Sequence, residues 1–394
     1  MANTKFSISS FVSAVILFYM AMPYFVWHGF VSSIYVKTIL GFIAGGLFFV
    51  NRRKLSSRER FLFLLLLVAL LLYLVLGGHN FNFFLTVFPV AFLPFAKESY
   101  SRSVYSFFLI IYVFFVGIGL LSWLGALIGI IPPIGSIEAL NSMKSYNYSV
   151  YPFFVSLAGF PLLRFHGPFD EPGVVGTISG ILLCIEQFNF KNKKSIILLL
   201  SGLCSLSLFF YVLLGVYYIM YYALKKRGTL RTVFAVALVL GGFMLIQRVP
   251  VLQEAVGARL EWDSERGTLV GDNRINNEIA QDYLNSIAGT RQFWFGIDDK
   301  EGYLDSIAGS SSFVTVILLN GMVFVILYLL FFILYANYYR RQWSSVILFL
   351  VVFISTIYQR PNTFQMLYMF LFTYLAKIDS IMAATEKQPQ TITV

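Results

Sequence analysis

The amino-acid sequence predicts an all-α polytopic membrane protein that forms a single integral membrane domain over residues 1–394. Hydrophobic residues make up 58% of the 394-residue chain, aromatic residues 18% and charged residues only 12%. A soluble domain carries about 25% charged residues. Apolar runs near the length of roughly 20 residues that crosses the hydrocarbon core as a helix recur along most of the chain. Together these observations place the chain in a lipid bilayer.

Charge and cysteine content narrow the class further. The net charge of +10 is compatible with nucleic-acid binding, but the basic residues stand in short clusters beside apolar runs, where they attract anionic lipid headgroups. We therefore expect the bilayer, and no nucleic acid, as a partner. Cys184 and Cys204 both fall inside apolar runs, so the sequence predicts neither a disulfide framework nor a zinc site.

The apolar runs, taken in order, predict the membrane spans. The first run lacks a small-residue cleavage site and is followed by further spans, so it is a transmembrane helix and not a signal peptide. Several runs are short and must tilt or be shielded by neighbouring helices. The predicted spans lie near residues 9–28, 34–50, 61–77, 81–96, 104–128, 172–188, 195–224, 232–247, 313–337, 344–358 and 364–377.

Basic clusters between the spans predict the orientation. By the positive-inside rule they are cytoplasmic, which requires an even number of crossings between successive clusters. Residues 195–224 lie between two clusters, and as one continuous helix they would measure about 45 Å. We therefore expect this run to break near Ser205-Leu206-Ser207 into two short segments buried in protein, with a re-entrant hairpin as the alternative. This gives about 12 transmembrane helices with cytoplasmic N- and C-termini.

Two long segments fall on the outer face. Residues 129–171 form a first structured periplasmic loop, and residues 248–312 form a second, which holds eleven acidic and six basic residues. Long loops with structure of their own are usually functional. In the first loop, Tyr148 belongs to an aromatic stretch, 146–154, that could stack on sugars or form an interfacial aromatic belt. Residues 378–394 are expected to be a frayed cytoplasmic tail.

One cluster of ionisable residues stands where the first loop meets a span. Within eight residues the chain places Arg164, His166, Asp170 and Glu171, in a turn fixed by glycine and proline. Ionisable groups are costly at a bilayer, so the cluster is a functional-site hypothesis. The alternative is an interfacial loop whose charges sit in headgroup water.

Three arginines are predicted on the outer side against the orientation bias: Arg164, Arg274 and Arg360. Arg360 lies in a very short connection with no acidic residue nearby in sequence, so its counter-ion must come from a remote segment or from a ligand. A guanidinium suits a diphosphate because it binds two oxygens at once and stays charged. We expect the three to converge on one outward-facing cavity. Separate snorkelling to lipid headgroups is the alternative.

At these residues the chain resembles the Wzy-type O-antigen polymerase and O-antigen ligase superfamily of bacterial envelope glycosyltransferases. The resemblance covers about residues 104–375. It rests on Arg164-x-x-Gly167-x-Phe169-x-Glu171-Pro172, on Arg274 before Phe293-Trp294-Phe295-Gly296-Ile297, and on Gly321 after Asn320. The ligase branch is expected to carry a histidine just before the helix near Phe313, where this chain has Ser310-Ser311-Ser312, and His28, His79 and His166 all lie elsewhere. The polymerase branch is therefore favoured.

The resemblance implies a GT-C-like enzyme of the bacterial inner membrane that polymerises undecaprenyl-diphosphate-linked oligosaccharide repeat units at the periplasmic face. A chain-length regulator and a flippase of the same pathway are the implied protein partners. The arginines would bind the departing diphosphate, since electrostatic stabilisation is usually the largest catalytic term. The attacking hydroxyl needs a general base, for which Glu171 is the first candidate, followed by Asp170 and His166.

No metal or other cofactor is expected. Metal-dependent polyprenyl-phosphate glycosyltransferases hold acidic ligands in an early outer loop, and residues 28–33 contain none. Asp298, Asp299 and Glu301 form a dense carboxylate group that could bind a hard cation, although a solvated acidic turn is favoured. The competing class is a lipid-linked oligosaccharide flippase, which should place charges within several spans near the midplane. Here the ionisable groups are concentrated outside the spans, which favours an enzyme.

Overall fold

The structure of the protein is a computed structural model. It describes residues 7–78, 81–141, 144–160, 162–225, 229–250, 253, 257–258, 261–264, 268–269, 278–306, 313–340, 342–361 and 364–386.

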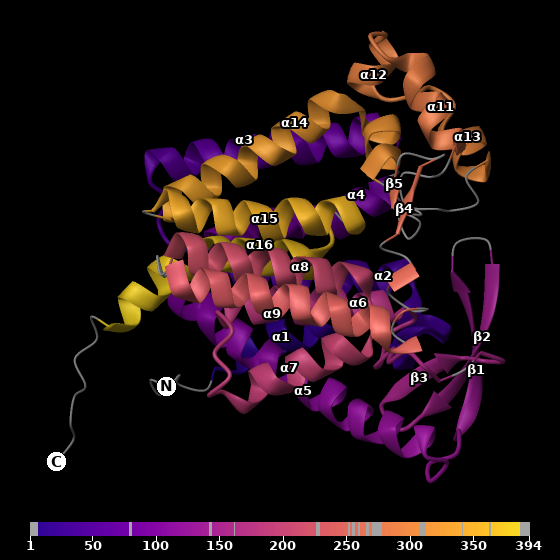
Figure 1. Ribbon diagram of the computed structural model, residues 1–394. Coiled ribbons are helices and arrows are strands. Elements are labelled where there is room, and N and C mark those ends of the chain that lie inside the picture. The colour runs from indigo at the N-terminus through magenta and orange to yellow at the C-terminus, as the bar shows by residue number, and fades with distance from the viewer. Residues whose placement is uncertain are drawn as a thin grey trace.

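Roughly antiparallel helices form a bundle with extra structure gathered at one end (Figure 1). Its helices are α1 (Ile8–Tyr19), α2 (Ile34–Val50), α3 (Ser57–Leu76), α4 (Phe81–Val87), α5 (Glu98–Leu127), α6 (Pro172–Ile185), α7 (Lys193–Cys204), α8 (Leu208–Met220), α9 (Thr229–Arg248), α14 (Phe313–Tyr339), α15 (Trp343–Gln359) and α16 (Met366–Glu386). Among the described residues, α3, α5 and α14 are long and apolar enough to cross a membrane, and several shorter apolar helices accompany them. These features support a mostly helical membrane protein.

Prolines account for two departures from the predicted spans. The first span was expected over residues 9–28, but α1 ends at Tyr19 and is followed by the 3₁₀ turns η1 (Tyr24–Val26) and η2 (Gly29–Ser32). Pro23 cannot donate a helical hydrogen bond and restricts the residue before it. In the fourth span, Pro89 and Pro94 fall within η3 (Phe88–Phe95), a 3₁₀ continuation of α4.

The predicted break at Ser205-Leu206-Ser207 is confirmed. Helix α7 ends at Cys204, Leu206 adopts a left-handed φ of 48°, and α8 begins at Leu208 before continuing as the π-helical turn η4 (Tyr221–Lys225). Both helices pack against α6. Within this turn, Ser205 Oγ accepts a hydrogen bond from the Ser207 backbone N–H at 3.3 Å.

The first long loop folds into a sheet that the all-α prediction did not include. Strands β1 (Gly135–Asn141), β2 (Lys144–Tyr151) and β3 (Phe154–Leu157) form an antiparallel meander, with Gly135 opposite Val150 and Tyr151 opposite Phe154. The signal was the period-two alternation of tyrosine and valine with serine and asparagine in β2.

The second long loop lies at the same end of the bundle, which we call the loop end (Figure 1). Its described elements are the strands β4 (Trp262–Asp263) and β5 (Thr268–Leu269) and the helices α11 (Glu278–Ile287), α12 (Arg291–Phe295) and α13 (Lys300–Ser306). Gly321 interrupts α14 with a φ of 77° where the helix passes α12. A Cβ on Gly321 would collide with the backbone of residues 294–295.

A polar network joins the helices at the opposite end. Arg53, between α2 and α3, binds Glu59, Tyr339 and Glu98, the last at 2.8 Å. Tyr339 also donates to Glu59 at 2.6 Å. Helix α16, whose apolar run was expected to give way to a frayed tail after Lys377, instead continues to Glu386. The reason is that Ile378 and Ile381 are buried against the core.

Candidate functional site

Glu171, the residue immediately before α6, lies at the centre of the candidate site. Glu171 occupies the N-cap position with an extended backbone, and Pro172 follows at the first helical position, where its missing N–H costs nothing. The Glu171 side chain makes no capping hydrogen bond to the helix. Its carboxylate is therefore available to a partner from another element, next to a helix N-terminus that favours negative charge.

That partner is Arg360, which follows α15. The Arg360 guanidinium lies 2.5 Å from a Glu171 carboxylate oxygen, and their side chains are 14% and 44% exposed. The counter-ion of Arg360, expected from a remote segment or a ligand, thus comes from a segment 189 residues away. Neighbouring Asp170, Glu171 and Tyr368 outweigh the effect of burial and raise the pKa of Arg360. Among the described residues, Arg360 Nε is buried without an acceptor.

A close approach of helix backbone permits this ion pair. Gly173 stands in the first turn of α6, and a Cβ built on it would lie 2.6 Å from the Arg360 guanidinium. Any larger residue would force the guanidinium away. Glycine is therefore required here for space, and its position two residues after Glu171 was a sequence signal that the motif analysis did not use.

His166 is held as a neutral imidazole. Its Nδ1 lies 3.0 Å from the Asp170 carbonyl oxygen, which can only accept, so Nδ1 carries the proton and Nε2 the lone pair. Burial and the charge of Arg164 together lower the pKa of His166 to about 4, against the opposing effects of the Asp170 carbonyl and Glu171. A neutral imidazole with a free lone pair on Nε2 is a candidate proton acceptor.

The two adjacent carboxylates occupy different environments. Burial raises the pKa of Asp170, the negative charge of Glu171 raises it further, and Arg360 opposes both effects. Glu171 is half-exposed and paired. The pair therefore offers one half-exposed carboxylate held by an arginine and a second carboxylate whose pKa is raised by burial.

Arg164 lies on the other side of the loop. Its Nε donates to the Ser205 carbonyl at 3.2 Å and its Nη2 to the Leu206 carbonyl at 3.4 Å. A cation is favourable there because these carbonyls end α7. Arg164 is thus close enough to influence His166 but binds the α7–α8 break, whereas Arg360 binds Glu171. Arg274, the third expected cation, lies outside the described residues.

Tyr148 forms a wall of the site. It lies in β2, is buried, and meets Trp27 edge to face with ring centroids 5.1 Å apart. Burial and the charges of Asp170 and Glu171 raise the pKa of Tyr148, so its hydroxyl stays protonated and faces the carboxylates. The ring does not lie in an exposed aromatic belt.

Two wall residues were missed by the sequence analysis. Trp27 comes from the connection after α1, and Tyr368, buried in the first turn of α16, lies near Arg360 and both carboxylates. Both are aromatic residues in an aromatic-rich chain, so nothing in the sequence distinguishes them. Tertiary packing alone brings them to the site.

The remaining motifs of the second loop support the structure of that loop. The Ile297 backbone N–H donates to the Leu318 carbonyl at 2.8 Å, so the segment 293–297 packs against α14 beside Gly321. Asp299 accepts from the Gly302 N–H at 3.0 Å, and Asp298 accepts from Gln292 at 3.0 Å. These bonds fit a solvated acidic turn.

The site combines the Arg360 cation, the neutral imidazole of His166 and the carboxylates of Asp170 and Glu171. Aromatic side chains line one side of it. Such a site can bind an anion and accept a proton beside it. Comparison of the chain with protein-family models, with curated proteins and with solved structures finds no match.

Proposed function

We propose that the protein is a glycosyltransferase of the O-antigen polymerase type. It joins undecaprenyl-diphosphate-linked oligosaccharide repeat units into O-antigen or a related surface polysaccharide at the periplasmic face of the bacterial inner membrane. The observation that carries the proposal is the largely buried Arg360 paired with half-exposed Glu171 at the loop end of an apolar helical bundle. A permanent cation beside a carboxylate is suited to a reaction that releases a diphosphate and a proton together.

The membrane arrangement that goes with this function has about 12 crossings, with the loop end periplasmic and both termini cytoplasmic. Helices α7 and α8 each make one short crossing, shielded by α6. The lipid-linked substrates then reach the site from the outer leaflet, where their diphosphates lie at the depth of the loop end.

In the proposed reaction, a sugar hydroxyl oxygen of one repeat unit attacks the anomeric carbon of a chain held on a second polyprenyl diphosphate. The new glycosidic C–O bond forms as the C–O bond to the diphosphate breaks. The bonding pair leaves with the diphosphate, and Arg360 stabilises the charge that develops there; Arg164 and Arg274 are the other two cations that we assign to the diphosphate. Preorganised cations in a water-poor site act strongly on such charge.

The hydroxyl proton passes to a general base, a role that we assign first to Glu171. Its carboxylate is accessible and already oriented by Arg360. Asp170, whose pKa is raised, and His166, whose Nε2 carries a lone pair, are the alternatives. No step of this scheme requires a metal ion.

The test uses purified protein in proteoliposomes with a lipid-linked repeat unit, and products are separated as a ladder. Glu171→Gln should lower the polymerisation rate by about 10²–10⁴-fold, the usual contribution of a general base. The matched control is Glu186→Gln at the opposite end of the same helix, where the glutamate binds Tyr105 and Asn192. It should retain the wild-type ladder.

Two outcomes contradict the proposal or part of it. A normal ladder from Glu171→Gln would remove Glu171 as the base and leave His166 and Asp170. If wild-type protein makes no polymer but moves the lipid-linked unit across the bilayer, the protein is a transporter and the enzyme proposal is wrong.

A further inference from the structure

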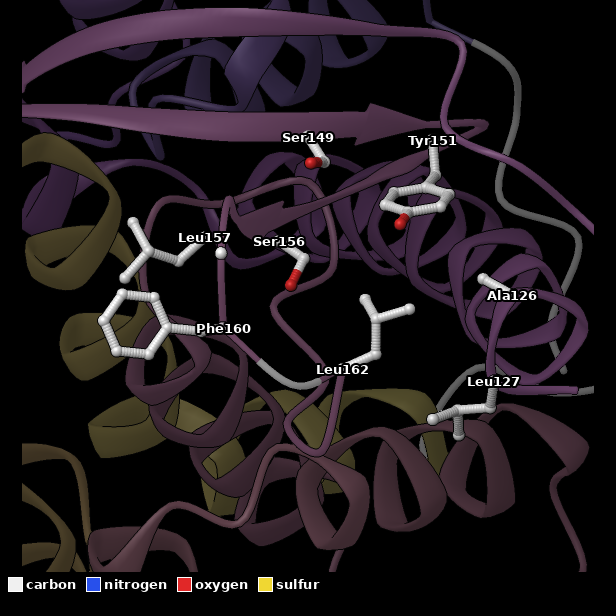
Figure 2. A pocket seen from close by; sticks show the side chains of 9 residues that line it. Ala126, Leu127, Ser149, Tyr151, Ser156, Leu157, Phe160 and Leu162 are labelled. Atoms are coloured by element: carbon white, nitrogen blue, oxygen red, sulfur yellow. The ribbon is translucent and has the colours of Figure 1, made fainter. Parts of the chain in front are cut away.

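A cavity of about 470 Å³ lies at the loop end, between the sheet and the end of α5. Its walls come from β2, β3, the segment that follows β3, and Ala126 and Leu127 of α5 (Figure 2). The volume falls in the range of about 300–1,000 Å³ typical of small-molecule sites. Trp123 fixes one wall, because its indole N–H donates to the Leu162 carbonyl at 3.0 Å.

The cavity and the charged site lie on opposite faces of one strand. Side chains alternate along β2, so Tyr148 faces the carboxylates whereas Ser149 and Tyr151 face the cavity. Ser156 of β3 lies directly opposite Ser149 and joins the same face. A molecule bound in the cavity is therefore separated from the charged site by the thickness of a single sheet.

Three hydroxyl groups line the cavity without partners. Ser156 and Tyr151 direct theirs toward the space above Leu162 (Figure 2). Among the described residues, the hydroxyls of Ser149, Tyr151 and Ser156 make no hydrogen bond to another protein group, and all three residues line the cavity. Each of these hydroxyls can donate to, and accept from, a molecule bound in the cavity.

The lining also defines the charge of the occupant. None of the described residues that line the cavity is charged, so it offers no counter-ion for a phosphate or carboxylate. The Tyr151 ring, stacked on Phe154 at 4.4 Å, and Leu162 supply apolar surface. Exposed Phe160 and Leu127 belong to the lining, which gives the cavity an apolar rim suited to the membrane interface.

From these features we infer that the cavity binds a neutral sugar residue of a lipid-linked saccharide. Alternating hydroxyls and apolar faces of a sugar match the hydroxyls and apolar surface of the cavity, and the rim fits a molecule that arrives from the bilayer. The inference deepens the proposed function by adding a neutral saccharide subsite across β2 from the charged site. The site itself rests on the lining and does not require that polymerisation be correct.

The test measures binding of neutral methyl glycosides to the full-length protein in nanodiscs, prepared without sugar detergents, by saturation-transfer NMR. The probes are the methyl glycosides of glucose, galactose, mannose, rhamnose and N-acetylglucosamine. At least one should bind, and Tyr151→Phe or Ser156→Ala should weaken it about threefold to tenfold, as expected for loss of one neutral hydrogen bond. Ser156→Leu, which fills the cavity, should abolish binding.

Tyr146→Phe is the matched control, because it removes the same hydroxyl from the opposite face of β2 and should leave binding unchanged. Thermal unfolding midpoints confirm that each variant is folded; the two hydroxyl deletions are independent, so one misfolded variant does not decide the result. The proposal is overturned if no glycoside binds, or if all cavity variants bind like wild type. It is also overturned if native mass spectrometry finds a phospholipid that is lost only in Ser156→Leu.

The polymerisation assay separates this proposal from the proposed function. Glycoside binding by a protein that makes no ladder would support the cavity and reject the polymerase. A normal ladder together with wild-type behaviour of every cavity variant would do the reverse.

Discussion

Arg360 is charged although its side chain is largely buried, and the carboxylate of Glu171 offsets the cost of burying that charge. Removing one partner of a fully buried ion pair costs about 3–5 kcal/mol. Solvent screening reduces this cost because Glu171 is 44% exposed. We therefore expect the pair to contribute about 1–3 kcal/mol, enough to order the connection between α15 and α16 before any substrate binds.

Arg360→Lys should lower the polymerisation rate by about 10–150-fold, because lysine keeps the charge but loses the planar fork and one charge-assisted hydrogen bond. Gly173→Ala should reproduce this loss without altering any charge, since its methyl group would occupy the place of the guanidinium. Initial rates in the ladder assay measure both effects. Arg60→Lys, on an exposed turn of α3, is the control. Wild-type rates from Arg360→Lys would instead indicate a headgroup anchor.

The lowered pKa of His166 predicts a loss of stability in acid. Between about pH 6.5 and 4 the unfolded histidine binds a proton that the folded one excludes, so stability falls as pH falls, by up to about 1.4 kcal/mol per pH unit. The raised pKa of Asp170 acts in the opposite direction. His166→Gln keeps a donor for the Asp170 carbonyl and does not titrate. The difference in unfolding midpoint between wild type and this variant should therefore change across that window; a constant difference would exclude a buried neutral His166.

At the scale of elements, α6 sits against the α7–α8 break with little spare space. A Cβ on Gly176 would lie 2.5 Å from that of Ser207. Gly176→Ala should therefore destabilise the protein by about 1–3 kcal/mol through overpacking, despite the better helix propensity of alanine. The control is Gly46→Ala in α2, which meets nothing within 4 Å and should be neutral or stabilising. Thermal unfolding measures the difference in stability between the two variants. Equal midpoints would show that the α7–α8 break can shift to accommodate the added methyl group without a loss of stability.

An element could be predicted from the sequence where a single physical constraint, such as charge or length, decided its structure. The break at residues 205–207 followed from charge and length, since two basic clusters cannot flank a single crossing. The sheet was not predicted because the sequence was divided by the length of its apolar runs, which left 129–171 as a loop. The alternation that marks β2 spans only eight residues. Helix α16 outlasted its predicted span because burial of Ile381 depends on neighbours that sequence does not reveal.

The sequence predicted most of the residues of the candidate site but not how they contact one another. Local spacing gathered Arg164, His166, Asp170 and Glu171, and the missing counter-ion of Arg360 indicated a remote partner. Sequence could not identify Glu171 as that partner, because the contact joins segments 189 residues apart. Nor could it show that Arg164 turns toward the α7–α8 break.

At the scale of the whole molecule, the proposed orientation can be tested directly. Reporters inserted after Lys194 and after Arg231 should both be cytoplasmic, because α7 and α8 return the chain to the end from which it came. A reporter near Asp299, in the second loop, should be periplasmic. Protease protection of spheroplasts gives an independent reading of the same three positions. Opposite locations for the first two reporters would reject two separate crossings and favour a re-entrant hairpin.

The network around Arg53 also sets the order in which the protein can be made. Arg53 and Glu59 leave the ribosome early, but their partner Tyr339 follows Arg53 by 286 residues. Arg53 can pair early with Glu59 and Glu98, whereas this tyrosine follows roughly 14–57 s later at about 5–20 residues per second. During biogenesis the network is therefore complete only when the last helices arrive. A nascent chain halted before α14 would lack Tyr339, the residue that joins Arg53 and Glu59 to the C-terminal helices.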